Sequence, residues 1–236
     1  MSEAGASSLV GREAQVAALG RFAEELAGGT GAAIVVRGDP GIGKTALWRR
    51  GIEVAQGTGV RVLSTRCAES EMPIAVGALA DLVESSFGEV AEELPAPQRE
   101  ALAAAIGVEA TASPAPDRIA LPRAVSATLR LLAEAGPLLV AIDDAQWLDP
   151  VSLRLLAFAF RRTGGRPIGA LTTIRGSGPE PLGLTDSYGD PRFQELHPRP
   201  LSAGGQCTAR SRPTLRCWVM WAMAKWGKRS TICCYG

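Results

Sequence analysis

The sequence predicts an α/β fold in which a mostly parallel sheet lies between two layers of helices, a three-layer sandwich. Short apolar runs typical of buried strands alternate with segments whose apolar residues recur at helical spacing. One run, 32–36, leads into a glycine-rich loop, and another, 137–142, leads into two carboxylates. Ligands of open α/β sheets bind at the carboxyl ends of the strands, so a binding site is expected there.

Each element follows from its own pattern. Helices are expected over 13–27, 75–87 and 118–134 and after Asp149-Pro150, where Asp149 suits the N-cap and Pro150 the first helical position. Strands are expected at 32–36, 59–64, 137–142, 168–174 and 193–197, the last at an edge. Residues 88–117 show a weaker pattern, and a surface loop is expected at 112–116.

The glycine-rich loop matches Gly-x4-Gly-Lys-Thr, the phosphate-binding loop pattern. Its residues are Gly38, Asp39, Pro40, Gly41, Ile42, Gly43, Lys44 and Thr45. Glycines let the backbone N–H groups close around phosphate oxygens, and the following helix points its N-terminus at them. Lys44 would neutralise the β- and γ-phosphates, and Thr45 would offer a hydroxyl to Mg²⁺. The expected ligands are ATP or ADP with Mg²⁺, and a plain glycine turn is the alternative.

Two acids and one arginine complete the predicted site. We assign Asp143 to the metal and Asp144 to the attacking water, the alternative being a solvated turn. Arg175 ends the strand at 168–174 and is placed to reach a γ-phosphate, unless it is an ordinary surface arginine. His197, the only histidine, is expected to be structural or at the surface. The extra strand at 59–64 suggests that the loop strand and the acidic strand are not neighbours.

Three stretches together resemble the ATPase domain of the large ATP-binding LuxR-type regulators, bacterial STAND proteins within the AAA+-like P-loop NTPases. They are residues 9–13 (Leu-Val-Gly-Arg-Glu), the loop 38–45, and 143–153 (Asp-Asp-Ala-Gln-Trp-Leu-Asp-Pro-Val-Ser-Leu). The resemblance covers about residues 8–200. It implies that Val10, Gly11 and Arg12 lie near the adenine. It also implies a nucleotide switch that hydrolyses ATP slowly, with an oligomer favoured in the ATP state.

Members of that family continue with a winged-helix segment, helical sensor repeats and a DNA-binding helix-turn-helix, none of which is present in this sequence. The expected organisation is a tail at 1–8, the ATPase domain at 9–200 and an atypical tail at 201–236. Residues 200–236 contain six of the 25 Lys and Arg, none of the 24 Asp and Glu, and four of the five cysteines. We interpret this segment as a disordered, frame-shifted or truncated end, with metal, membrane or nucleic-acid contact as alternatives.

Composition sets the remaining expectations. The net charge of +1, the single cysteine before residue 200 and the lack of a signal sequence or long apolar run predict a cytoplasmic protein. Direct DNA binding and membrane contact are not expected of this fragment. Two other functions stay open: a stand-alone kinase-like P-loop enzyme with its acceptor over residues 66–117, and an oligomerisation module that binds ATP without turnover.

Overall fold

The computed structural model describes residue 9 and residues 11–108 and 119–200. Arg12–Pro200 forms one compact unit. The predictions for the tails 1–8 and 201–236, for the loop at 112–116 and for Val10 concern residues outside those described. No helix of the described part is long and apolar enough to cross a membrane.

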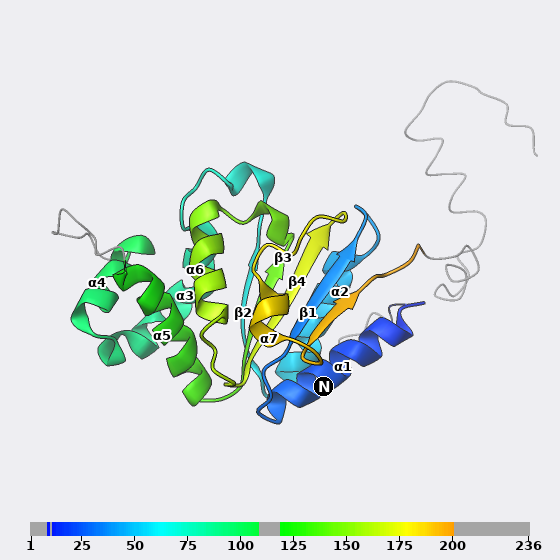
Figure 1. Ribbon diagram of the computed structural model, residues 1–236, viewed down its shortest axis with the longest axis horizontal. Helices are drawn as coiled ribbons and strands as arrows, with labels where there is room; N and C mark the ends of the chain where they lie inside the picture. The colour runs from blue at the N-terminus through cyan, green and yellow to red at the C-terminus, as the bar shows by residue number, and fades with distance from the viewer. Residues whose placement is uncertain (1–8, 10, 109–118, 201–236) are drawn as a thin grey trace, which may run out of the picture. The chain divides into compact units, whose positions relative to one another are not determined.

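The centre of the unit is a five-stranded parallel sheet (Figure 1). Its strands are β1 (Ala33–Gly38), β2 (Arg61–Arg66), β3 (Leu138–Asp143), β4 (Ile168–Arg175) and β5 (Phe193–Leu196). Their order is β2-β3-β4-β1-β5, so β4 separates the loop strand β1 from the acidic strand β3, as the extra strand suggested. The fold prediction is confirmed, including β5 as an edge strand.

The helices follow the predicted stripes closely. They are α1 (Glu13–Ala27), α2 (Lys44–Gly57), α3 (Gly77–Val90), α4 (Ala96–Ala105), α5 (Ala120–Glu134), α6 (Pro150–Phe160) and α7 (Leu184–Tyr188), with short 3₁₀ turns η1 (Glu69–Glu71), η2 (Ala91–Glu93) and η3 (Ala145–Trp147). The sequence pattern did not predict α4 and α7. Both are short, and each buries only two side chains, so neither has a long apolar stripe.

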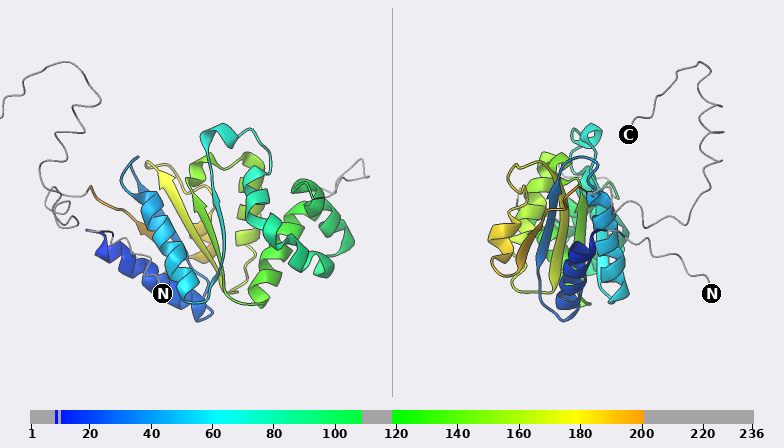
Figure 2. Two further views of the ribbon diagram at one scale, coloured as in Figure 1. Left: turned by 180° about the vertical axis from the view of Figure 1, so that it is seen from behind. Right: turned by 90° about the vertical axis from the view of Figure 1, so that its right-hand side faces the viewer.

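Helices cover both faces of the sheet. Figure 2 shows α1 and α2 on one side and α6 and α7 on the other. Helix α2 lies close to the sheet because Gly51 has no Cβ, which would stand 2.5 Å from Leu171 Cδ2 and 3.1 Å from Leu19 Cδ2. On the opposite face, alternate strand residues such as Val35 and Val140 join the main apolar core with α3, α5 and α6. The helices α3 to α5 gather beside β2 (Figure 1).

Candidate nucleotide-binding site

The phosphate-binding loop joins the end of β1 to the start of α2. Gly41 and Gly43 adopt φ values of +78° and +99°, in the left-handed region that favours glycine. A Cβ at either position would meet no atom within 4 Å, so open space lies beside the loop at both glycines. The N-terminus of the 14-residue helix α2 adds unpaired backbone N–H groups at the same place. The loop therefore offers both space and positive potential to an anion.

Lys44 lies buried inside the loop. Its Nζ donates to the backbone oxygens of Gly38 at 3.0 Å and of Asp39 at 2.9 Å. Burial lowers the pKa of Lys44 below its ordinary value, while the charge of Asp144 opposes this shift and that of Arg175 adds to it. The ammonium group thus sits within the loop, held by two of the loop's backbone oxygens.

Arg12, the residue before α1, contacts the same loop. It is 5% exposed, and its Nη2 donates to the backbone oxygen of Ile42 at 2.7 Å. The expectation for Arg12 was a place near the adenine, and the contact found is to the loop backbone itself. Gly11, in the chain's other unit, has φ +75°, and Val10 lies outside the described residues.

A buried carboxylate links three strands and α2. Asp143 at the end of β3 is 1% exposed and accepts from Thr45 Oγ1 at 2.9 Å and from Thr173 Oγ1 at 2.6 Å. Arg66, at the end of β2, donates from Nε to Asp143 Oδ2 at 3.2 Å. The two residues predicted to hold a metal, Thr45 and Asp143, are therefore in direct contact.

The second carboxylate, Asp144, faces an arginine. Arg175 donates from Nε to Asp144 Oδ1 and from Nη2 to Oδ2, both at 3.0 Å. Gln146 donates to Asp144 Oδ1 at 3.0 Å and accepts from the backbone N–H of Arg175 at 3.1 Å. Burial by itself would raise the pKa of Asp144. Hydrogen bonds from Arg175 and Gln146 favour the ionised form and outweigh burial, so the pKa lies below its ordinary value.

The backbone at Asp144 is held in an uncommon conformation. Its φ of +53° and ψ of +50° lie in the left-handed region, and its N–H donates to Thr173 Oγ1 at 2.7 Å. The Thr173 hydroxyl therefore accepts from Asp144 while donating to Asp143. This single buried hydroxyl fixes two consecutive acids.

Sequence reasoning missed Thr173, Gln146 and Arg66 as parts of this cluster. A usable signal existed for Thr173 and Arg66, since each is a polar residue at the carboxyl end of a strand next to β3. In the parallel register Arg66 pairs with Asp143, and Thr172 pairs with Ile142, which places Thr173 level with Asp143. Gln146 gave no such signal, because it lies in the 3₁₀ turn η3 and not in a strand whose register could be compared with that of β3.

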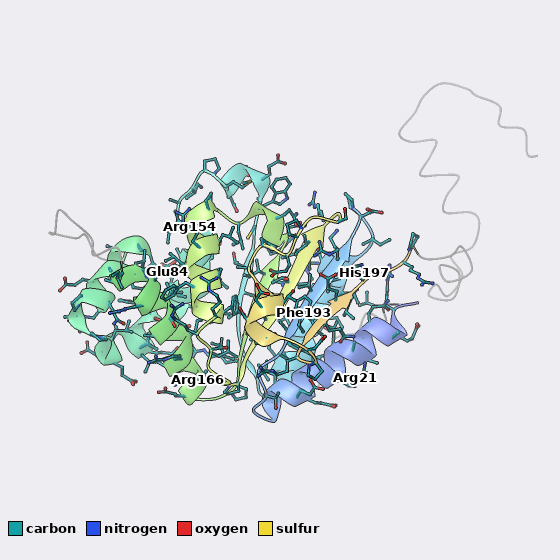
Figure 3. All side chains as sticks on the ribbon, viewed as in Figure 1. Arg21, Glu84, Arg154, Arg166, Phe193 and His197 are labelled. Atoms are coloured by element: carbon teal, nitrogen blue, oxygen red, sulfur yellow. The ribbon has the colours of Figure 1, made fainter. Side chains whose placement is uncertain are left out.

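The chain returns to the loop after β5. A Cβ on Gly38 would lie 3.0 Å from Ile42 Cγ2 and 3.7 Å from Pro198 Cγ, so Pro198 lies beside the first residue of the loop. His197 is 61% exposed, with Nε2 3.2 Å from Glu195 Oε2, a surface position visible in Figure 3.

The residues present fit a nucleotide with Mg²⁺. The glycine loop has open space at Gly41 and Gly43 and holds the buried ammonium group of Lys44. The Thr45 hydroxyl and the Asp143 carboxylate bring two oxygen donors together, and oxygen is the ligand that Mg²⁺ prefers.

A family model of the AAA ATPase domain matches residues 8–171, which include the glycine loop and both acids. The chain belongs to the AAA ATPase domain family. It is thus an AAA-type P-loop domain that binds nucleotide, and Thr173 and Arg175 lie just beyond the matched segment.

Relatives of this AAA ATPase domain include an uncharacterised protein of Rhizobium meliloti (strain 1021), 25% identical over 196 residues. The match spans 72% of this chain and only 19% of that protein. Among solved structures, the Orc1 protein of Aeropyrum pernix in complex with DNA has a TM-score of 0.48 at 20% identity, covering 84% of this chain and 47% of that one. AMPPCP-bound DnaA of Aquifex aeolicus has a TM-score of 0.42 at 13% identity, covering 94% and 53%.

Proposed function

We propose that this AAA ATPase domain is a Mg²⁺-dependent ATP switch with slow hydrolysis, of the LuxR-type regulator kind. One observation carries the proposal: the acid next to the candidate metal ligand is engaged by Arg175 through two hydrogen bonds. Asp144, which we assign to the attacking water, is thus bound by Arg175, which we assign to the γ-phosphate. Such an arrangement suits a domain that changes state with its nucleotide more than one that turns over rapidly.

Each residue of the site has its own role in this proposal. The backbone N–H groups of 38–45 and the Lys44 ammonium would bind and orient the β- and γ-phosphates. Thr45 and Asp143 would hold Mg²⁺, which when bound supplies positive charge to the phosphate oxygens. Asp144 would orient the attacking water and accept its proton, once Arg175 has left its carboxylate for the γ-phosphate. Arg12 would keep the loop in shape through the Ile42 oxygen.

Asp144→Asn tests the switch directly. The variant keeps the size of the side chain but loses the negative charge, so we expect ATP to bind within about threefold of wild type while turnover falls at least tenfold. Binding is measured with a fluorescent ATP analogue and turnover as released phosphate. Unchanged turnover would remove Asp144 from its role. ATP binding with no turnover even in the wild type would favour the oligomerisation module.

The role of the whole protein is a separate part of the proposal. The chain matches 19% of the length of its Rhizobium relative, which leaves room for sensor and DNA-binding domains elsewhere. We propose that the gene encodes such domains in another reading frame beyond codon 203, and that the ATP state forms a homo-oligomer. Resequencing the gene tests the proposed reading frame. Light scattering tests the proposed homo-oligomer by comparing the molar mass of the protein with ATP and with ADP. Early stops in every other frame would contradict the proposed reading frame.

A further inference from the structure

A buried arginine of the inner strand β1 has no part in the site described above. Arg37 directly precedes Gly38, the first residue of the phosphate-binding loop, and it is 9% exposed. It lies two residues after Val35, so its side chain leaves the sheet on the same face as that core residue. Burying a guanidinium group is costly unless its donors are paired, so its partners indicate what the residue does.

The guanidinium group of Arg37 holds the chain that leaves β4. Its Nη1 donates to the backbone oxygen of Gly178 at 2.6 Å and, with a longer contact, to that of Gly176 at 3.4 Å. Within the described part of the chain, no other hydrogen bond to residues 176–179 is found. Because this segment directly follows Arg175, the two contacts anchor the first residues beyond the end of β4.

The anchored segment has little else to fix its path. Residues 176–179 are Gly-Ser-Gly-Pro, and all four are exposed. Gly176 adopts a φ of +69°, in the left-handed region, and a Cβ there would meet no atom within 4 Å. Ordering such a segment costs conformational entropy, so contacts from a rigid inner strand decide which path it takes.

The other side of the Arg37 guanidinium group is fixed by the edge strand β5. Its Nη2 donates to Glu195 Oε1 at 3.0 Å, and its Nε donates to Oε2 at 3.4 Å. This pairing with Arg37 holds the pKa of the Glu195 carboxyl below its ordinary value. The guanidinium group therefore has one orientation, in which Nε and Nη2 face β5 while Nη1 faces the chain after β4.

Arg175 lies between two fixed points of the backbone. Before it, β4 pairs with β1, which places Gly38 opposite Arg175, and the Arg175 N–H donates to Gln146 Oε1 at 3.1 Å. After it, the chain is held by Arg37. The Arg175 side chain is 45% exposed, so packing alone does not direct its guanidinium group toward Asp144. The direction of the backbone on both sides of Arg175 has to do so.

We propose that Arg37 is a positioning residue for Arg175. By holding the carbonyl groups of Gly176 and Gly178, it keeps the Arg175 guanidinium group against Asp144. This effect on the ion pair does not depend on nucleotide, whereas its consequence for ATP turnover rests on the proposed function. Because Arg37 is also the residue before Gly38, one residue joins the phosphate-binding loop to the chain after β4.

The test follows the Arg175 Nε–H by NMR without nucleotide. This N–H donates to Asp144 Oδ1 at 3.0 Å, so its rate of hydrogen exchange reports how firmly the pair is held. Its signal is assigned as the one lost in Arg175→Lys. Arg37→Met removes the donors and keeps most of the side-chain length, so we expect exchange at least about threefold faster. Arg37→Lys keeps the charge without the fork and should give an intermediate rate.

Glu195→Gln is the matched control. It removes the charge that faces Arg37 and leaves the contacts with Gly176 and Gly178 in place, so exchange should stay near the wild-type rate. Wild-type exchange in folded Arg37→Met or Arg37→Lys protein would overturn the proposal. Equal acceleration in Glu195→Gln would overturn it too, because the effect would then belong to the ion pair with β5.

A double-mutant cycle separates positioning from the loss of the Arg37 charge itself. Hydrogen bonds from Arg175 lower the pKa of Asp144, so Arg37→Met should raise this pKa when Arg175 is present. In the Arg175→Ala background, Arg37→Met should have no further effect. An equal rise in both backgrounds would overturn the proposal, since Arg37 would then act on Asp144 without Arg175.

ATP turnover is measured separately, to keep this inference distinct from the proposed function. We expect Arg37→Met to lower kcat at least about threefold, because Arg175 reaches the γ-phosphate less often, while an ATP analogue binds within about threefold of wild type. Faster exchange in Arg37→Met with unchanged turnover in both Arg37→Met and Arg175→Ala would support the positioning role. That result would overturn only the role proposed for Arg175 in the switch.

Discussion

Arg175 and Asp144 meet in a two-point ion pair, Nε to Oδ1 and Nη2 to Oδ2, each at 3.0 Å. The Asp144 side chain is 17% exposed and that of Arg175 45%, so the pair lies at the rim of the site. Gln146 bridges both residues and fixes their separation. Neither residue can act on a phosphate or a water while it is fully engaged by the other, which makes this pair the first target for mutation.

Replacing Arg175 by alanine is expected to raise the pKa of Asp144. The Asp144 pKa lies below its ordinary value, so the ionised carboxylate stabilises the fold at pH values above the unfolded-state pKa of about 3.9. This stabilisation is lost as the pH falls through the folded-state pKa. The variant should lose less stability than wild type between neutral pH and about pH 3. NMR titration of the Asp144 carboxyl carbon measures the shift. The exposed Arg154→Ala on α6 is the control, and an identical Asp144 titration in Arg175→Ala would contradict the assignment.

Lys44→Ala is expected to abolish nucleotide binding, because it removes the ammonium group that the phosphate-binding loop holds. We expect at least a hundredfold rise in Kd for an ATP analogue, in line with losing a charge-assisted contact of about 3 kcal/mol. Lys44→Met keeps most of the side-chain volume without the charge, so it separates the loss of charge from the loss of packing. Equal affinity in wild type and Lys44→Ala would remove Lys44 from the phosphate site.

Thr173→Val is expected to destabilise the fold by about 1–3 kcal/mol, because it leaves the buried Asp143 Oδ1 and the Asp144 N–H without their shared partner. Urea unfolding measures the change. Thr173→Ser keeps the hydroxyl and should cost less than half as much. If valine and serine behaved alike, the hydroxyl would not be the group that matters.

Gly31→Ala should destabilise the protein by about 1–3 kcal/mol through overpacking. The new Cβ would lie 2.5 Å from the backbone oxygen of Arg166 and 2.9 Å from that of Ile168, and backbone atoms cannot turn aside. Gly20→Ala within α1 is the matched control, since its Cβ meets nothing within 4 Å and should stabilise the helix by about 0.5–1 kcal/mol. Thermal unfolding of both variants gives the comparison.

Periodicity in the sequence predicted the sheet and the long helices because each buries a regular apolar face, as α1 shows over 13–27. The loop and the two acids could be predicted because their chemistry depends on consecutive residues. The Asp144–Arg175 pair could not, since it joins positions 31 residues apart whose approach depends on the left-handed backbone at Asp144. The Asp149 carboxylate shows the same limit. Its N-cap role on α6 was predictable, but its bond to Val76 N, 73 residues away, was not.

Pro198 lies against Gly38 two residues before the compact unit ends at Pro200. Residues 197–200 consequently run beside the first residue of the phosphate-binding loop. A displacement of residues 197–200 can therefore reach the loop directly through Pro198. A shift of the loop on gaining or losing phosphate can pass back along the same four residues toward β5.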